Sequence, residues 1–232
     1  MKKNKDIQRK RHNLGYLIAT ITTLLLIVIL FLPQSKTLLK PGPMNTGHAS
    51  LDCTACHRDA KGSLRQQLQA NVQYLINNRS TLADVGYRPV ISQDCLSCHS
   101  RKNDRHPIFR FNEPRFKDAR DAIQPHKCIS CHQEHQGVRI TSKENFCSNC
   151  HKDLKLKKDP VDISHESLVK DKKWKTCLRC HDYHGNHIMA SINELEKAHP
   201  QRVISEYFKG SESPYSEKKR YKANKTRKKN EK

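Results

Sequence analysis

The ten cysteines of this chain fall into five copies of one pattern, in which two cysteines three positions apart are followed at once by histidine. The copies are Cys53-Thr-Ala-Cys56-His57, Cys95-Leu-Ser-Cys98-His99, Cys128-Ile-Ser-Cys131-His132, Cys147-Ser-Asn-Cys150-His151 and Cys177-Leu-Arg-Cys180-His181. Two thiols at this spacing can add across the two vinyl groups of one haem, and the histidine then lies beneath the iron as its proximal ligand. The pattern therefore predicts five covalently bound haem c groups.

Paired cysteines have three other uses, namely zinc binding, disulfide formation and dithiol redox chemistry. None of these requires histidine after every second cysteine. The chain has 14 histidines in 232 residues, and chance would place one after all five pairs about once in a million sequences. The haem interpretation is favoured over all three.

The second axial ligand of each iron decides between an electron carrier and an enzyme with an open site. Methionine is scarce, with three copies, whereas histidine is abundant. We predict histidine at both axial positions of every iron, and low reduction potentials. The distal candidates are His48, His106, His135, His165 and His184, with His187 as the alternate. His135 and His184 each follow a motif histidine by three residues, an offset that points toward a neighbouring haem.

The composition is compatible with a folded domain only if these cofactors are included. Only 35% of residues are apolar and 29% are charged, and much of the apolar content lies in one N-terminal run. Side chains after residue 40 would not offset the entropy of folding, so porphyrins must form the core. We predict a mainly α-helical or irregular pentahaem domain over 48–200, with little strand. Ser63 and Gln66 resemble a capping box, which predicts a helix over 63–77. We expect it to lay its apolar face on haems, and the alternative is a helix that docks on a membrane partner.

Residues 14–32 are uncharged and, as a helix, would span about 28 Å, which is close to the thickness of a bilayer's hydrocarbon core. Six Lys or Arg residues precede this run and few follow closely, so 1–13 should be cytoplasmic and the rest periplasmic, with the anchor in the inner membrane. A cleaved signal peptide would need an A-x-A-like cleavage site after the apolar run, and residues 31–36 contain no such site. We expect 33–47 to be a linker and 201–232 a basic, disordered tail.

The formal charge of +21 raises the possibility of nucleic-acid binding. Five oxidised haems would contribute about −5, which leaves the protein positive. We therefore expect an acidic redox partner or anionic lipid headgroups as neighbours, and export excludes DNA.

The string from Cys128 to Gly137, CISCHQEHQG, is similar to one that recurs in class III multihaem cytochromes, the cytochrome c3 and c7 group. The resemblance covers about residues 46–190. It implies bis-histidine haems, little regular secondary structure and electron transfer. The NapC/NirT/NrfH quinol dehydrogenases also combine an anchor with clustered haems, but they carry a methionine two residues after a motif histidine. Methionine is missing from all five corresponding positions here, which argues against direct quinol oxidation.

The leading hypothesis is an electron carrier, not an enzyme, that connects a membrane donor, quinol-linked or a dehydrogenase, with an extracytoplasmic acceptor. A quinol dehydrogenase is one alternative. Another is a haem enzyme with one open iron that reduces a nitrogen or sulfur oxyanion, although no motif replaces its histidine by the lysine found in nitrite reductases of this kind. The anchor and the haem count also fit a subunit of a larger respiratory complex.

Overall fold

The computed structural model describes residues 2–32 and 40–224. The chain divides into two compact units, residues 1–43 and residues 44–232. Residues 33–39 of the predicted linker and residues 225–232 of the predicted tail lie outside the described part.

The first unit contains one helix, α1 (Lys2–Phe31). Its segment Gln8–Ile29 is long and apolar enough to cross a membrane. Two threonines within it donate their hydroxyl hydrogens to backbone carbonyls one turn earlier, Thr20 to Tyr16 and Thr23 to Ala19, both at 2.8 Å. These bonds satisfy the hydroxyl groups without water, as a lipid environment requires.

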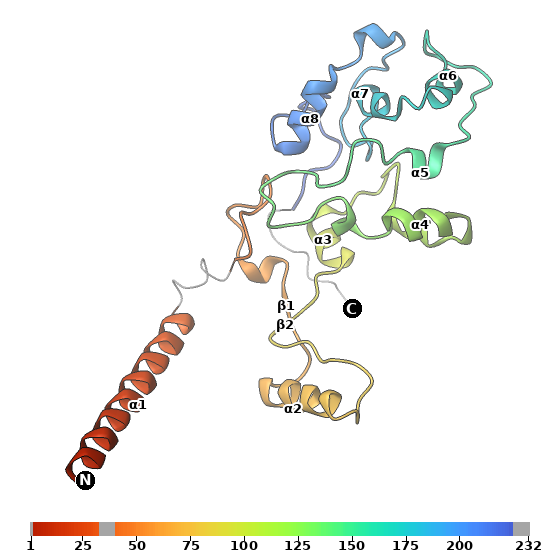
Figure 1. The fold of residues 1–232 in the computed structure, drawn as a ribbon. Helices are drawn as coiled ribbons and strands as arrows, with labels where there is room; N and C mark the ends of the chain where they lie inside the picture. The colour runs from red at the N-terminus through yellow and green to blue at the C-terminus, as the bar shows by residue number, and fades with distance from the viewer. Residues whose placement is uncertain (1, 33–39, 225–232) are drawn as a thin grey trace. The chain divides into compact units, whose positions relative to one another are not determined.

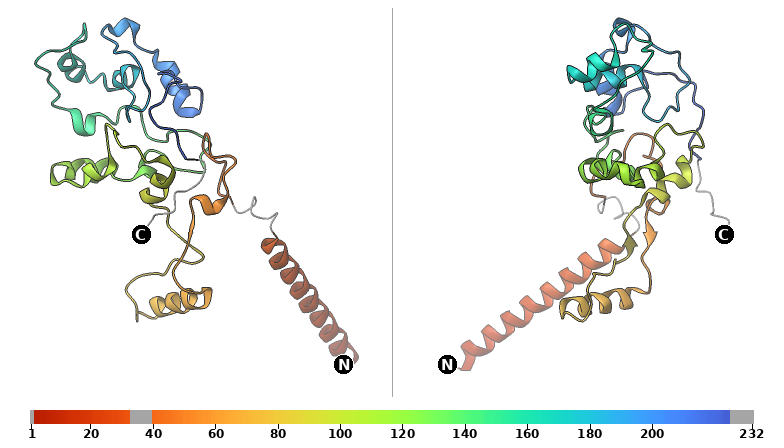
Figure 2. Two further views of the ribbon diagram at one scale, coloured as in Figure 1. Left: turned by 180° about the vertical axis from the view of Figure 1, so that it is seen from behind. Right: turned by 90° about the vertical axis from the view of Figure 1, so that its right-hand side faces the viewer.

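The second unit is mostly helical and irregular, as predicted, with one pair of short strands (Figures 1 and 2). Its α-helices are α2 (Leu64–Leu75), α3 (Ser92–His99), α4 (Lys117–Ile123), α5 (Ser148–His151), α6 (His165–Lys170), α7 (Cys177–Cys180) and α8 (Gln201–Lys209). Its 3-10 helices are η2 (Cys53–Ala55), η3 (Ile108–Asn112), η4 (Pro114–Phe116), η5 (Cys128–Ser130), η6 (Trp174–Thr176) and η7 (Leu195–Lys197). Most helices span a single turn or two, so tertiary contacts rather than helix propensity must hold them.

Strands β1 (Arg58–Asp59) and β2 (Tyr87–Arg88) pair antiparallel at the base of an arm formed by residues 60–86. The predicted capping box begins α2 within this arm. The Ser63 backbone N–H donates to the Gln66 side-chain oxygen at 2.8 Å, and the Gln66 N–H donates to the Ser63 hydroxyl at 3.4 Å. The sequence therefore located this helix correctly.

Asp94 on α3 fastens the strand pair to the helix that carries the second motif. Its side chain is 1% exposed and accepts hydrogen bonds from Arg58 at 3.0 Å and from Arg88 at 2.8 Å. Burial alone would raise the pKa of Asp94, but the hydrogen bonds from Arg88, from the Ile91 N–H and from Arg58 outweigh it and lower this pKa to about 2.

A small side-chain core lies near the C-terminal end of the described chain. Leu178, Ile204, Phe208 and Tyr215 are buried together, and Ile204 is fully buried. The Tyr215 hydroxyl donates to the Leu178 carbonyl at 2.8 Å. Three of these four residues belong to the segment predicted as a disordered tail.

The structure thus differs from that expectation over residues 201–224. Helix α8 ends at Gly210, whose φ of +117° suits glycine. Arg139 donates to the carbonyls of Gly210 and Ser211 at 3.1 and 2.9 Å, and its guanidinium lies 4.6 Å from the Tyr207 ring centroid. The physical reason is that Ile204 and Phe208, one turn apart, form an apolar face within an otherwise charged segment.

Candidate functional site

Each cysteine motif closes as one helical turn that brings its histidine next to the two thiols. The backbone N–H of the histidine donates to the carbonyl of the first cysteine, four residues earlier. The distances are 2.9 Å for His57 and His181 and 3.0 Å for His132 and His151. The second motif lies within α3. The turn therefore holds the histidine one helical turn from the first cysteine.

Each motif histidine also faces one of the predicted distal histidines. The pairs, with their ring-centroid separations, are His57 with His135 (6.3 Å), His99 with His48 (5.9 Å), His132 with His184 (6.2 Å), His151 with His106 (6.2 Å) and His181 with His165 (6.1 Å). Two imidazoles that each lie about 2 Å from a shared metal have centroids about 6 Å apart. All five spacings therefore leave room for one metal atom between the rings.

The hydrogen bonds of the paired rings determine which ring nitrogen is left to bind a metal. The Nδ1 atoms of five of these histidines lie within hydrogen-bond distance of oxygens that can only accept. The contacts are His48 to Glu134 (2.5 Å), His165 to Asp159 (2.9 Å), His184 to Asp104 (3.0 Å), His106 to the Tyr183 carbonyl (2.6 Å) and His132 to the Arg139 carbonyl (2.9 Å). Each contact places the proton on Nδ1 and leaves the Nε2 lone pair for a metal.

The surroundings keep several of these rings neutral, which is the form that binds metal. Burial lowers the pKa of His99 to about 4. Burial also lowers the pKa values of His106, His132 and His181. The hydrogen bond to Glu134 acts in the opposite sense on His48 and raises its pKa.

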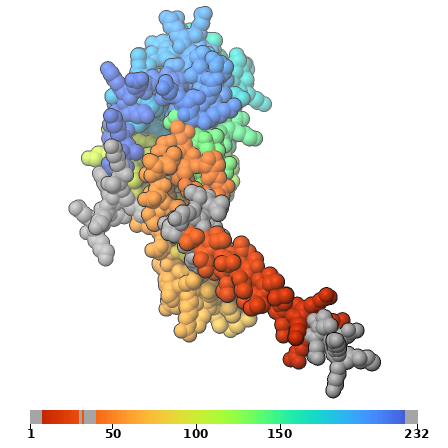
Figure 3. Space-filling view, turned by 90° about the vertical axis from the view of Figure 1, so that its left-hand side faces the viewer, coloured from red at the N-terminus to blue at the C-terminus, as the bar shows by residue number. Residues whose placement is uncertain are grey.

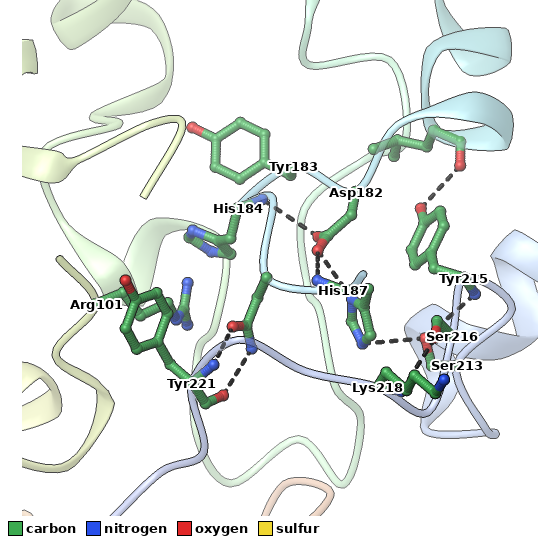
Figure 4. A network of polar contacts seen from close by, with 12 residues as sticks. Arg101, Asp182, Tyr183, His184, His187, Ser213, Tyr215, Ser216, Lys218 and Tyr221 are labelled. Atoms are coloured by element: carbon green, nitrogen blue, oxygen red, sulfur yellow. Dashed lines mark hydrogen bonds and ion pairs between the residues drawn. The ribbon is translucent and has the colours of Figure 1, made fainter. Parts of the chain in front are cut away.

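His187, the alternate candidate, has a different environment (Figure 4). Its Nδ1 donates to Asp182 at 2.8 Å, and its Nε2 lies 3.2 Å from the Ser213 hydroxyl. The residue is buried and its ring contacts Tyr215 rather than a motif histidine. With both nitrogens already in hydrogen bonds, His187 connects the fifth motif's loop to the C-terminal segment.

The ten cysteines all lie within the described residues, and none of them is joined in a disulfide. The side chains of Cys95 and Cys128 lie within hydrogen-bond distance of each other, and so do those of Cys147 and Cys177. The second motif therefore adjoins the third, and the fourth adjoins the fifth.

The residues present fit haem as the bound group. Within the described chain, no group of three or more His, Cys, Asp or Glu could hold a bare metal ion, so the cysteine pairs do not combine into four-ligand zinc sites. Large apolar side chains near the motifs remain exposed in the polypeptide, among them Ile91, Phe109 and Ile129. A porphyrin attached at each motif would supply the missing apolar surface.

Sequence reasoning missed the groups that orient the rings. Asp104, Glu134, Asp159 and the Tyr183 carbonyl contact distal histidines, and the Arg139 carbonyl contacts the motif histidine His132. Adjacency in the sequence does not find the acidic ones, because Glu134 adjoins His135 but contacts the His48 ring, and Asp104 lies two residues before His106 but contacts the His184 ring. The carbonyls carry no sequence signal, since every residue has one.

Residues 34–141 match the family model of outer membrane cytochrome MtrC/MtrF-like domains II/IV. The matched range contains the first three cysteine motifs and ends before the fourth. Neither the curated proteins nor the solved structures gave a match. The family match supports a multihaem c-type cytochrome and favours electron transfer over catalysis.

Proposed function

We propose that this chain is a membrane-anchored pentahaem c-type cytochrome of the class III kind. In this proposal it relays single electrons between a membrane donor, quinol-linked or a dehydrogenase, and an extracytoplasmic acceptor. The observation that carries the proposal is the set of five histidine pairs at 5.9–6.3 Å. One iron per pair, held by both Nε2 atoms, accounts for that spacing.

Each proposed site consists of two thioether cysteines, a proximal histidine and a distal histidine. Site 1 has Cys53, Cys56, His57 and His135; site 2 has Cys95, Cys98, His99 and His48; site 3 has Cys128, Cys131, His132 and His184; site 4 has Cys147, Cys150, His151 and His106; site 5 has Cys177, Cys180, His181 and His165.

Haem supplies the reversible ferric–ferrous couple when bound. The polypeptide keeps the sites close together. His135 of site 1 follows His132 of site 3 by three residues, and His184 of site 3 follows His181 of site 5 by the same offset. The Cys95–Cys128 contact adds site 2 to this group. Site 3 therefore adjoins sites 1, 2 and 5 and forms a junction in the relay.

Site 4 joins the relay through two routes. The Cys147–Cys177 contact connects it to site 5. The Tyr183 ring stacks on His106 of site 4 at 4.2 Å, and Tyr183 directly precedes His184 of site 3. All five sites thus form one connected network, which favours electron transfer through the chain.

An imidazole on each side of every iron would leave no coordination position for a substrate. This arrangement favours a carrier over the alternative with one open iron. The apolar helix α1 would hold the carrier in the inner membrane, and the excess of Lys and Arg before it favours an N-terminus in the cytoplasm and haems in the periplasm.

Spectroscopy of distal-ligand variants tests the proposal. The purified protein should have a mass that exceeds its amino acids by five haems, and its ferric electron paramagnetic resonance spectrum should be entirely low-spin. His184→Ala should convert one haem of the five to high-spin, because the Nε2 donor is lost. The matched variant His187→Ala should leave every haem low-spin.

A high-spin signal in the unmodified protein would contradict the relay and favour an open site. Loss of low-spin character in His187→Ala would overturn the assignment of distal ligands.

A further inference from the structure

Helix α2 is held to its arm by polar side chains. Gln67 is buried, and its amide nitrogen donates to the Gly62 carbonyl at 2.9 Å while its oxygen accepts from the Gly86 N–H at 2.9 Å. One turn later, Asn71 exchanges two hydrogen bonds with the backbone of Ala83. The inward face of the helix is thus its polar face.

The apolar residues of α2 occupy a neighbouring face and point outward. Each is at least 51% exposed, although burial of such side chains is ordinarily favourable by about 1.5–3 kcal/mol each. They are Leu64, Leu68, Val72, Leu75 and, just after the helix, Ile76. A shallow, mainly apolar groove follows Leu64, Leu68 and Val72 along this face. A contiguous exposed apolar face of this kind indicates a contact with another surface.

The arm also stands apart from the haem sites. The β1–β2 pair separates α2 from His57, and α2 lies beyond this pair, away from the other helices of its unit (Figures 1 and 2). In the space-filling view the arm, in light orange, forms a projection of its own (Figure 3). Porphyrins attached at the motifs are therefore not the preferred cover for this face.

The charges of the arm favour an anionic surface. Residues 60–86 contain three basic residues, Lys61, Arg65 and Arg79, and one acidic residue, Asp84. Arg65 lines the apolar groove itself. Leucines beside cationic side chains are the pattern of helices that lie in the interface of a bilayer.

A membrane is also within reach of the arm's unit if α1 spans a bilayer. Twelve peptide steps separate Leu32, just after α1, from Met44, the first residue of the second unit. Even fully extended they cover only about 40 Å. The second unit is therefore confined to the neighbourhood of the bilayer surface.

We propose that the arm of residues 60–86 is a second membrane contact, in which the apolar face of α2 inserts among the headgroups of anionic phospholipids. This inference rests on the proposed anchoring by α1. Its consequence is a fixed orientation of the haem unit, since two contacts constrain rotation that a single tether allows.

Photo-crosslinking of the full-length holoprotein tests the inference. The protein is placed in nanodiscs of phosphatidylethanolamine and phosphatidylglycerol that contain a phospholipid with a photoreactive acyl chain, and adducts are mapped by mass spectrometry. We expect adducts both in α1 and in residues 64–76. The double variant Leu68→Gln/Val72→Gln should lose the α2 adducts and keep those in α1.

The matched control is Leu68→Met/Val72→Ile, which changes the same two positions but keeps the groove apolar, and it should keep both sets of adducts. Adducts in α1 without adducts in α2 would overturn the arm contact and leave the anchor intact, whereas missing α1 adducts would overturn the anchor first. Altered haem spectra in the Leu68→Gln/Val72→Gln variant would mean that a porphyrin covers this face, and crosslinks between two protein copies would mean that a second chain does. Either result would also overturn the lipid contact.

Discussion

At the scale of single residues, acidic side chains have two different roles in this protein. Asp104, Glu134 and Asp159 accept hydrogen bonds from the rings of distal histidines, whereas Asp94 accepts hydrogen bonds from Arg58 and Arg88. The first group should affect the redox properties of the sites and the second the stability of the fold. Substitutions can separate these roles.

Asp104 contacts the distal histidines of two sites, because it accepts from the His184 ring and from the His106 backbone N–H at 3.0 Å. Asp104→Asn removes the negative charge and weakens the Nδ1 hydrogen bond, which makes the imidazole a poorer donor to ferric iron. We expect at least one reduction potential to rise by about 30–60 mV in a spectroelectrochemical titration. The exposed control Asp171→Asn should shift no potential, and unchanged potentials in Asp104→Asn would contradict this role.

Asp94 should make the fold sensitive to acid. Its pKa is about 2 in the folded chain against 3.8 as the ordinary value, so its charge stabilises the fold above pH 3.8 and this contribution is lost as pH falls toward 2. Asp94→Asn should lower the free energy of unfolding at neutral pH by about 1–3 kcal/mol, because Arg58 and Arg88 lose their partner.

Denaturant unfolding followed by circular dichroism measures this effect across pH. The control is Asp121→Asn, which breaks an exposed ion pair with Lys117 and should change the free energy of unfolding much less, because water screens that pair. Equal losses in the two variants would count against a special role for Asp94.

At the scale of elements, the short helices depend on their neighbours, and α8 is the clearest case. It is fixed by Arg139 at its C-terminal end and by Glu144, which accepts hydrogen bonds from Gln201 and, at 2.6 Å, from Ser205. The Arg139 carbonyl in turn accepts from the His132 ring. The packing of α8 is therefore coupled to the position of a motif histidine.

Ile204 supplies the apolar part of this packing. It is fully buried, so Ile204→Ala should lower the free energy of unfolding by about 2–4 kcal/mol through lost burial and a cavity. Arg202→Ala on the exposed side of the same helix should change it by less than about 0.5 kcal/mol. Thermal or denaturant unfolding of both variants would measure the difference, and a similar small effect in both would show that α8 is not part of the core.

Local features of this fold were predictable from the sequence, and distant pairings were not. The spacing of Ser63 and Gln66 located α2, and the uncharged N-terminal run located α1, because both signals lie within one element. Histidine counting selected five candidates that the structure places opposite the motif histidines, yet spacing alone could not assign His48 to His99, 51 residues away in the chain. Helix α8 was missed because its charged residues dominate the composition, although Ile204 and Phe208 follow helical spacing.

At the scale of the whole molecule, charge is the dominant property. The formal charge of +21 would stay positive after addition of the propionates and ferric irons of the five proposed haems. Electron transfer with an acidic redox protein should therefore slow several-fold as salt rises from about 0.01 to 0.5 M. Stopped-flow mixing of the full-length holoprotein in neutral detergent measures this rate.

A neutral small-molecule reductant is the control for this experiment, and its rate should depend little on salt. A rate with the acidic protein that is equally insensitive to salt would contradict electrostatic docking on a positive surface.

The pairing of the rings would also set an order of assembly if the part of the chain that follows α1 is exported in sequence order. Site 2 has both of its imidazoles once residue 99 has emerged, and sites 1, 4 and 5 follow at residues 135, 151 and 181. Site 3 has both of its imidazoles only after residue 184 has emerged. The junction of the relay would thus be the last site to receive its second ligand, and a chain stopped during export just before that residue would hold four finished sites around an unfinished centre.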